Sequence, residues 1–271
     1  MKFMKKDSLE HTEELENNLG IVGSASSRLG SRKSQQDAYY LSTADPGCVL
    51  AVLCDGMGGM EGGELASQTA VRAFVRDFEK IRNKEDNFYD FLREEVDAVD
   101  QLVSSLTDAR GRRLDSGTTL VATIIVDGFF QYVAVGDSRI YLIREGTLYQ
   151  ITRDHNYLLY LDYQRKKDLM TEETYEIEKN RGEALISYIG MDGVAITDGN
   201  QRPFALEEND ILLMSSDGLY KALGDQEISK IVRENITSVS QIDHALQEAA
   251  GQAAPDSQDN TTVIVLRYQK I

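Results

Sequence analysis

Residues 118–135 read TTLVATIIVDGFFQYVAV, two runs of apolar, β-branched and aromatic residues on either side of Asp127 and Gly128. Such runs favour buried strands, and an Asp-Gly dipeptide between them favours a type I′ hairpin turn. The stretch therefore predicts an antiparallel hairpin, which two further strands follow along the chain. The predicted strands of this region are 118–126, 129–135, 139–144 and 147–152.

Helical periodicity lies on both sides of this strand region. Ala66, Ala70, Phe74 and Phe78 recur every four residues, and a second helical period runs over 88–106. Shorter helical patterns come after the strands. The other predicted elements are strands over 49–54, 211–215 and 261–267, and helices over 227–232 and 242–250.

Strands and helices are grouped along the chain rather than alternating one by one, which favours an α+β fold over a parallel βαβ sheet. We predict an antiparallel β-sandwich flanked by helix pairs, in a four-layer α-β-β-α arrangement. Residues 1–18 are expected to form a flexible N-terminal segment, and residues 19–271 a single domain. The polar, charged stretch 155–190 is expected to be a surface insert or lid.

The chain is strongly acidic. Lys and Arg number 29 and Asp and Glu 45, a net charge of −16 at pH 7, which argues against nucleic acid or an anionic membrane as the main partner. No apolar run approaches the ~18 residues of a membrane span, and residues 1–18 lack the apolar block of a signal peptide or anchor. We therefore expect a cytoplasmic protein, with Cys48 and Cys54 as reduced, buried thiols.

Aspartates stand at the ends of several predicted strands. Asp55 follows CVLAVLC, Asp137 follows YVAVG, Asp217 follows ILLMSS, and Asp259 precedes the strand that begins at 261. If these ends meet at one edge, the carboxylates repel one another unless cations lie between them. Ligand sets made of oxygen alone favour Mg²⁺ or Mn²⁺ over zinc.

Five Asp-Gly pairs occur, and most such pairs are simple turns. We assign Asp127, Asp192 and Asp198 to turns. Asp55 and Asp217 differ, because the first leads into a glycine cluster and the second ends a buried strand. The motifs of serine hydrolases and of P-loop nucleotide-binding proteins are absent from the sequence.

Six short motifs occur in order along the chain. They are Arg32-Lys33-Ser34-Gln35-Gln36-Asp37-Ala38, Asp55-Gly56-Met57-Gly58-Gly59 with Gly63-Glu64, Ser116-Gly117-Thr118-Thr119, Gly136-Asp137-Ser138-Arg139, Ser216-Asp217-Gly218 and Asp259-Asn260-Thr261-Thr262. Over about residues 19–268 they resemble the bacterial branch of the metal-dependent protein phosphatase family, type 2C (PPM). The resemblance implies hydrolysis of phosphoserine and phosphothreonine by a metal-activated water. It also implies phosphorylated proteins as partners, together with a cognate kinase.

The resemblance further implies two divalent cations, Mn²⁺ or Mg²⁺, and a third, weaker one. Asp55 resembles the carboxylate that bridges the two ions, with the Gly56 carbonyl on one of them. Asp217 and Asp259 resemble ligands of the other ion, directly or through water. Asp137 resembles the acid that helps to hold the third ion; the alternative is that it caps a turn.

Two more residues have counterparts in the family pattern. Arg32 resembles the guanidinium that grips the substrate phosphate, because its planar fork of donors suits that anion; the alternative is a solvated surface arginine. Asp37 resembles an acid that orients metal-bound water. Together with Asp55, these are the predicted catalytic residues.

The chain departs from the family pattern at three positions. Gln35 stands where relatives commonly have Asn, Met60 where they have His, and Ser187 where they have Arg. One alternative function is therefore a weakly active or inactive sensor that uses the phosphatase fold to dock a partner. Another is a partner-switching phosphatase that acts on one small phosphoprotein.

Overall fold

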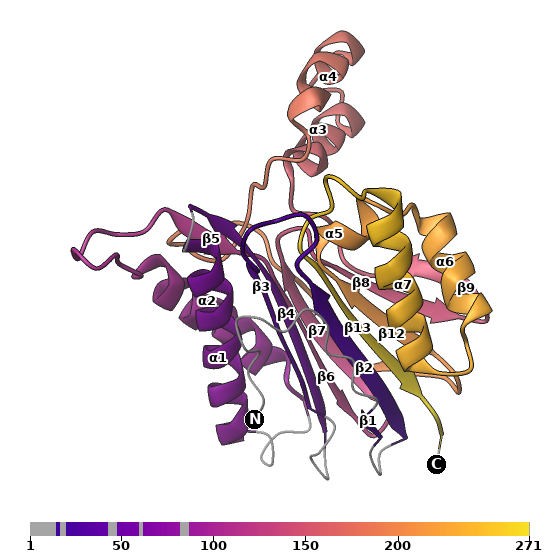
Figure 1. The fold of residues 1–271 in the computed structure, drawn as a ribbon. Coiled ribbons are helices and arrows are strands. Elements are labelled where there is room, and N and C mark those ends of the chain that lie inside the picture. Colours follow the sequence, from indigo (N-terminus) through magenta and orange to yellow (C-terminus); the bar gives the residue numbers. More distant parts are fainter. Residues whose placement is uncertain (1–14, 17–19, 43–47, 60–61, 82–86, 271) are drawn as a thin grey trace.

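The computed structural model describes residues 15–16, 20–42, 48–59, 62–81 and 87–270. In these residues the strands form two antiparallel sheets, and helices cover the outer face of each sheet (Figure 1). The predicted α+β class and its four-layer α-β-β-α order are therefore confirmed.

The first sheet has six strands in the order β1-β2-β13-β12-β8-β9. Each neighbouring pair is antiparallel, and β13 and β2 are paired along their whole length. Its strands are β1 (Leu15–Glu16), β2 (Ile21–Arg28), β8 (Arg139–Arg144), β9 (Thr147–Gln150), β12 (Ile211–Ser215) and β13 (Thr261–Tyr268).

The second sheet has seven strands, five of them in the order β10-β7-β6-β4-β3, with β11 on β7 and β5 on β4. Its pairings are also antiparallel. Its strands are β3 (Asp37–Ser42), β4 (Val49–Gly58), β5 (Ser116–Thr118), β6 (Leu120–Val126), β7 (Phe129–Val135), β10 (Asp198–Gly199) and β11 (Phe204–Ala205).

The helices divide into three groups (Figure 1). The pair α1 and α2 packs on the second sheet, and α5, α6 and α7 pack on the first. The short helices α3, α4 and η1 project from the body. The bounds are α1 (Gly62–Ile81), α2 (Tyr89–Ser104), α3 (Tyr157–Lys166), α4 (Glu172–Glu178), η1 (Lys179–Arg181), α5 (Asp217–Tyr220), α6 (Asp225–Glu234) and α7 (Val239–Ala253).

Strand β4 shows how one apolar run serves two cores. Leu50, Val52 and Cys54 point to α1 and α2, whereas Ala51 and Leu53 point to the space between the sheets. Successive side chains of a strand lie on opposite faces, so a strand covered on both faces is apolar throughout. Cys54 and Cys48 are buried and are not joined in a disulfide, which agrees with the predicted buried thiols.

The hairpin predicted around Asp127 and Gly128 is present. Asp127 and Gly128 have φ of 50° and 76°, the left-handed conformation that a type I′ turn requires. The predicted strand 118–126 is divided, however, because Thr119 stands between β5 and β6. The prediction that Asp198 lies in a turn is wrong: it pairs with β7 in β10, where its carboxylate accepts a hydrogen bond from the Arg153 amide at 2.9 Å.

The predicted flexible segment 1–18 is described only in part. Leu15 and Glu16 pair with β2, whereas the rest of 1–18 lies outside the described residues, as does Met60. Among the helices of the described residues, none is long and apolar enough to span a bilayer.

Candidate functional site

The candidate site begins where β3 and β4 pair. Asp37 and Asp55 are direct partners in this antiparallel register. Directly opposite residues carry their side chains on the same face, with Cβ atoms about 5 Å apart. The pairing of β3 with β4 therefore brings together two acids that are 18 positions apart in the sequence.

Asp37 also connects this pair to the other sheet. Its Oδ2 accepts a hydrogen bond from Ser216 Oγ at 2.8 Å and one from Thr262 Oγ1 at 2.7 Å. Its Oδ1 is buried and has no hydrogen-bond partner. Because a buried carboxylate oxygen without a partner is costly, Asp37 is suited to accept a proton or a hydrogen bond from a molecule bound beside it.

The backbone of Asp55 is held by two threonines. The Asp55 amide donates to Thr119 Oγ1 at 2.9 Å, and its carbonyl accepts from Thr118 Oγ1 at 2.9 Å and from the Thr119 amide at 2.8 Å. Thr119 Oγ1 also shares a hydrogen bond with Ser138 Oγ at 2.7 Å. The break between β5 and β6 thus fixes the direction of the Asp55 side chain.

Gly56 lies in a tight backbone crossing. A Cβ atom here would lie 2.1 Å from the Gly63 carbonyl oxygen and 2.6 Å from that of Gln36. Only glycine allows the start of α1 to pack on β4 at this distance. The glycine cluster therefore serves helix packing, and it sets the backbone directly after Asp55.

Asp217 and Asp259 come from the first sheet. Asp217 begins α5 directly after β12, and Asp259 lies just before β13. Asn260, which follows Asp259, contacts the segment between β2 and β3: its Oδ1 accepts from the Gln36 amide at 2.7 Å, and its Nδ2 donates to the Leu29 carbonyl at 2.8 Å. The antiparallel pairing of β12 with β13 thus brings both acids to the end of the sheets that carries Asp37.

Asp137 follows β7, and the backbone before it contacts His155, the first residue of the predicted insert 155–190. The amide of Gly136 donates to His155 Nδ1 at 3.2 Å, and the His155 amide donates to the Gly136 carbonyl at 2.9 Å. The imidazole is fully buried, and its Nε2 lies 3.5 Å from Asp198 Oδ1. His155 therefore positions the backbone just before Asp137.

The carboxylates at this edge repel one another. Burial raises the pKa of Asp37 from 3.8 to about 7, helped by the charges of Asp217 and Asp259 and opposed by its two hydroxyl donors. Burial and the neighbouring acids raise the pKa of Asp55 well above 3.8. Burial and the charge of Asp217 raise the pKa of Asp137 to about 6. We call this group of five, Asp37, Asp55, Asp137, Asp217 and Asp259, the acidic edge.

The acidic edge suits hard divalent cations. Its donors are oxygen alone, and Asp37 Oδ1 is buried without a partner. Burial, together with repulsion that cations would relieve, raises the pKa values of Asp37 and Asp55. Among the described residues, no three His, Cys, Asp or Glu side chains are arranged around a single ion position. Two expected ligands are turned to basic side chains instead: Asp217 Oδ2 lies 2.7 Å from Lys221 Nζ, and Asp259 Oδ2 lies 2.5 Å from an Arg32 nitrogen.

The predicted insert 155–190, called the lid below, contacts residues beside the acidic edge at both of its ends. At its end, the amide of Ile189 donates to the Thr118 carbonyl at 2.9 Å, next to Asp55. Ser187 is fully buried, and its Oγ bonds both the carbonyl and the amide of Ile196, at 2.8 and 2.9 Å. Ser187, which stands where relatives commonly have Arg, therefore holds residues 187–196 in a closed loop through these two hydrogen bonds.

The second alteration, Gln35, has a defined place too. Its Nε2 donates to Ser27 Oγ at 2.9 Å and to the Arg28 carbonyl at 3.0 Å, while its Oε1 accepts from the Asp37 amide at 2.9 Å. Gln35 therefore holds the chain that leads into Asp37.

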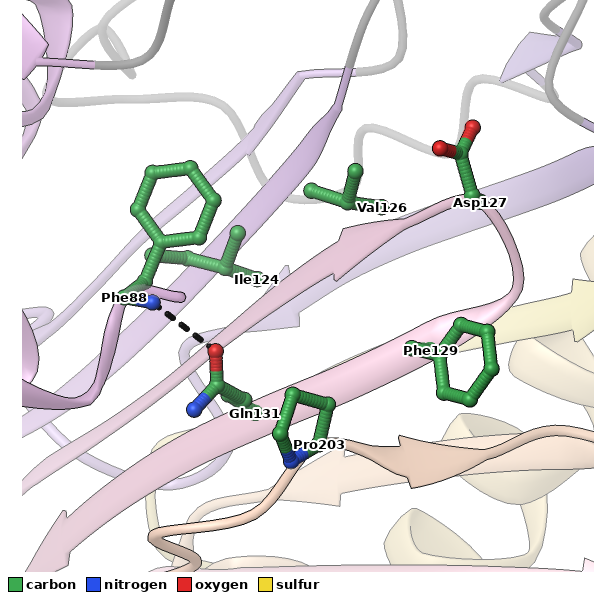
Figure 2. A pocket seen from close by; sticks show the side chains of 7 residues that line it. All are labelled: Phe88, Ile124, Val126, Asp127, Phe129, Gln131 and Pro203. Carbon is green, nitrogen blue, oxygen red and sulfur yellow. Dashed lines mark hydrogen bonds between the residues drawn. The ribbon is translucent and has the colours of Figure 1, made fainter. Parts of the chain in front are cut away.

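A pocket of about 400 Å³ lies at the other end of the second sheet (Figure 2). Phe88, Ile124 and Phe129 contribute to its lining, and the Phe88 amide donates to Gln131 Oε1 at 2.8 Å. In the pairing of β4 with β6, the pocket lies near the pair Val49–Ile125, whereas the pair Leu53–Val121, four residues further along, is the one nearest Asp55. The pocket is therefore separate from the acidic edge.

Several residues that hold the acidic edge in place were not predicted from the sequence. Ser216, Thr262, Asn260 and Thr119 lie within the quoted motifs, and their only signal is a polar residue at the end of a buried strand. His155 lies in no motif, so only its contact with Gly136 reveals it.

Comparisons with known proteins agree with this arrangement. The family model for protein phosphatase 2C matches residues 25–253. The serine/threonine phosphatase stp of Listeria welshimeri is 27% identical over 219 residues, covering 80% of this chain and 83% of that protein. Protein phosphatase PhpP of Streptococcus pneumoniae is 32% identical over 212 residues, covering 76% and 81%.

Solved structures share the fold. The serine/threonine phosphatase PstP/Ppp of Mycobacterium tuberculosis superposes with a TM-score of 0.71 at 25% identity, covering 92% of this chain and 99% of that chain. The catalytic domain of PstP in complex with two manganese ions superposes with a TM-score of 0.72 at 26% identity, covering 92% and 98%. The predicted family and enzyme class are thereby confirmed: the chain belongs to the protein phosphatase 2C family.

Proposed function

We propose that this chain hydrolyses phosphoserine and phosphothreonine in proteins and opposes a Ser/Thr kinase. The observation that carries the proposal is the acidic edge, where Asp37 pairs with Asp55 in one sheet and bonds Ser216, next to Asp217, in the other. Burial and the neighbouring charges raise the pKa values of Asp37, Asp55 and Asp137. The relatives named serine/threonine phosphatase support the choice of substrate. The sensor alternative gains no support from Ser187, because its hydroxyl is used in two hydrogen bonds to the backbone of Ile196.

The proposal assigns the acids to two divalent cations, Mn²⁺ or Mg²⁺. Asp55 would bridge them, the Gly56 carbonyl would bind one, and Asp217 and Asp259 the other; Asp137 would help to hold a third. When bound, such cations supply Lewis-acid activation of water and positive charge opposite the phosphoryl oxygens. The solved complex of PstP with two manganese ions supports this number.

The side chains of this chain would then orient and bind. Asp37 Oδ1, buried and unpartnered, would accept a hydrogen bond from the attacking water and so direct its oxygen at phosphorus. Arg32, whose side chain is 56% exposed beside Asp259, would bind the phosphoryl oxygens through its planar fork. The bond from the water oxygen to phosphorus forms as the bond from phosphorus to the Ser or Thr oxygen breaks. The water gives up one proton and the departing oxygen takes up one, which leaves inorganic phosphate and a free hydroxyl.

A metal titration tests the proposal. Purified protein is assayed on an aryl phosphate and on phosphoserine, phosphothreonine and phosphotyrosine peptides, with Mn²⁺, with Mg²⁺ and with EDTA. We expect metal-dependent release of phosphate from the aryl phosphate and from the first two peptides. No turnover with either metal would favour the sensor, whereas action on a single folded phosphoprotein and on no peptide would favour the partner-switching phosphatase.

A further inference from the structure

Lys221 lies where the first sheet, the lid and the acidic edge meet. It directly follows α5, and its Nζ is 2.7 Å from Asp217 Oδ2 on the same turn of the helix. The same Nζ is 3.7 Å from Glu183 Oε2, which belongs to the lid. The ammonium group is therefore shared between a proposed metal ligand and an acid of the lid.

A third carboxylate acts on the same group. Burial would lower the pKa of Lys221, but the charges of Asp217, Asp137 and Glu183 outweigh it and raise that pKa. Conversely, the charge of Lys221 opposes the burial and the repulsion that raise the pKa of Asp137. The ammonium thus neutralises the corner between Asp137 and Asp217.

This pair differs from an ordinary surface ion pair. Most exposed pairs four residues apart on a helix contribute little, because water screens them. Here the Asp217 side chain is only 18% exposed and that of Lys221 is 40% exposed, and the charges of Asp217, Asp137 and Glu183, from three separate parts of the chain, act on the ammonium group. The ammonium group of Lys221 thus supplies one positive charge beside Asp137 and Asp217, two carboxylates that would otherwise attract a divalent cation.

We propose that Lys221 is a tethered cation that competes with a divalent ion for the corner between Asp137 and Asp217. The inference rests on the proposed function, because it takes Asp217 as a metal ligand. With the lysine on Asp217 Oδ2, the third ion proposed at Asp137 is displaced, whereas Asp217 keeps its other carboxylate oxygen for the two ions at Asp55. Glu183 gives the displaced ammonium a second acceptor, so opening of this corner is linked to the position of the lid.

The test counts ions rather than turnover. Bound Mn²⁺ per chain is measured by equilibrium dialysis followed by metal analysis, for the wild type and for Lys221→Met, which keeps an unbranched side chain without the charge. We expect one more tightly bound ion in Lys221→Met, with an apparent Kd at least about tenfold lower than that of any corresponding wild-type ion. Adding Asp137→Asn to Lys221→Met should remove the extra ion.

Lys230→Met is the matched control, because Lys230 pairs with Glu227 on the surface of α6 at 3.2 Å and the net charge changes equally. We expect it to bind as many ions as the wild type. Equal ion numbers in Lys221→Met and the wild type would overturn the inference, even if existing ions bound more tightly. So would an equal gain in Lys230→Met. Wild-type protein that binds no Mn²⁺ would instead refute the metal site of the proposed function, and the inference with it.

Discussion

Single residues at the acidic edge combine a structural cost with a proposed chemical use. Asp217 is the clearest case: its charge raises the pKa values of Asp37, Asp55 and Asp137. Proteins tolerate such repulsion mainly at functional sites, where a ligand relieves it.

We therefore predict that Asp217→Asn lowers metal-dependent phosphate release at least about 100-fold, because a charged ligand is lost. The melting temperature in EDTA should stay within a few degrees of the wild type, since the change also removes a repelling charge. Asp127→Asn is the control: this residue lies in the hairpin turn with φ of 50°, a conformation that Asn tolerates. Near wild-type turnover in Asp217→Asn would contradict the ligand assignment.

At the scale of elements, buried polar residues fasten one segment to another. Asp100 on α2 holds the backbone of residues 190–193, at the end of the lid, through three hydrogen bonds. Its Oδ1 accepts from the Gly190 amide at 2.6 Å and the Met191 amide at 3.1 Å, and its Oδ2 accepts from the Gly193 amide at 2.7 Å. This loop adjoins Ile189, which pairs with Thr118 beside Asp55.

Asp100→Ala should lower the free energy of unfolding by about 3 kcal/mol or more, because it leaves buried amides without an acceptor. Asp100→Asn keeps one acceptor oxygen and should cost less. Urea unfolding measures both, and hydrogen exchange at 189–193 should quicken in Asp100→Ala before the rest of the chain. An alanine variant as stable as the wild type would show that water replaces the carboxylate fully.

The contact of α7 with β2 contains a second buried acid. Asp243 is fully buried and accepts hydrogen bonds from Ser24 Oγ at 2.8 Å and from Ser26 Oγ. Burial raises its pKa from 3.8 to about 6, although these two donors and the charges of His244 and Arg28 oppose the rise. The folded protein thus holds this proton more tightly than the unfolded chain does.

It follows that the contribution of Asp243 to stability is full below about pH 4 and is lost as the pH rises to about 6. Asp243→Asn does not titrate, so relative to the wild type its free energy of unfolding should increase over this range, by up to about 3 kcal/mol. Urea unfolding of both proteins at pH 4.5 and pH 7.5 measures the change. A difference between the two proteins that does not vary with pH would exclude this origin.

At the scale of the whole molecule, net charge and metal binding act together. The chain carries a net charge of −16, and the acids of both sheets meet only in the folded state. Cations that bind this edge therefore stabilise the folded state alone.

Mn²⁺ at about 100 times its Kd should raise the melting temperature by on the order of 5 °C over the value in EDTA. Differential scanning fluorimetry measures the shift, and Asp217→Asn should lose most of it. If Mn²⁺ left the melting temperature of the wild type unchanged, the proposed ions would not be part of the folded protein.

Local pattern was sufficient for much of the fold. The strands at 129–135, 139–144 and 211–215 end where predicted, because strand period and turn residues act over a few positions. The positions of Asp137, Asp217 and Asp259 next to strand ends were visible for the same reason. The prediction that Asp55 stands at a strand end is wrong, because β4 continues to Gly58 and pairs Asp55 with Asp37. Asp198 was misassigned because Asp-Gly is also compatible with a short edge strand, and its partner Arg153 is remote in sequence.

Tertiary structure alone decided what holds those acids. Asp37 accepts hydrogen bonds from residues 179 and 225 positions away, and Lys221 reaches both Asp217 and Glu183. No local period encodes such contacts, since they depend on how two sheets and a lid pack. The sequence by itself therefore determined the family, the layers and the positions of the acids. Long-range packing determined which hydroxyl, imidazole and ammonium groups support them.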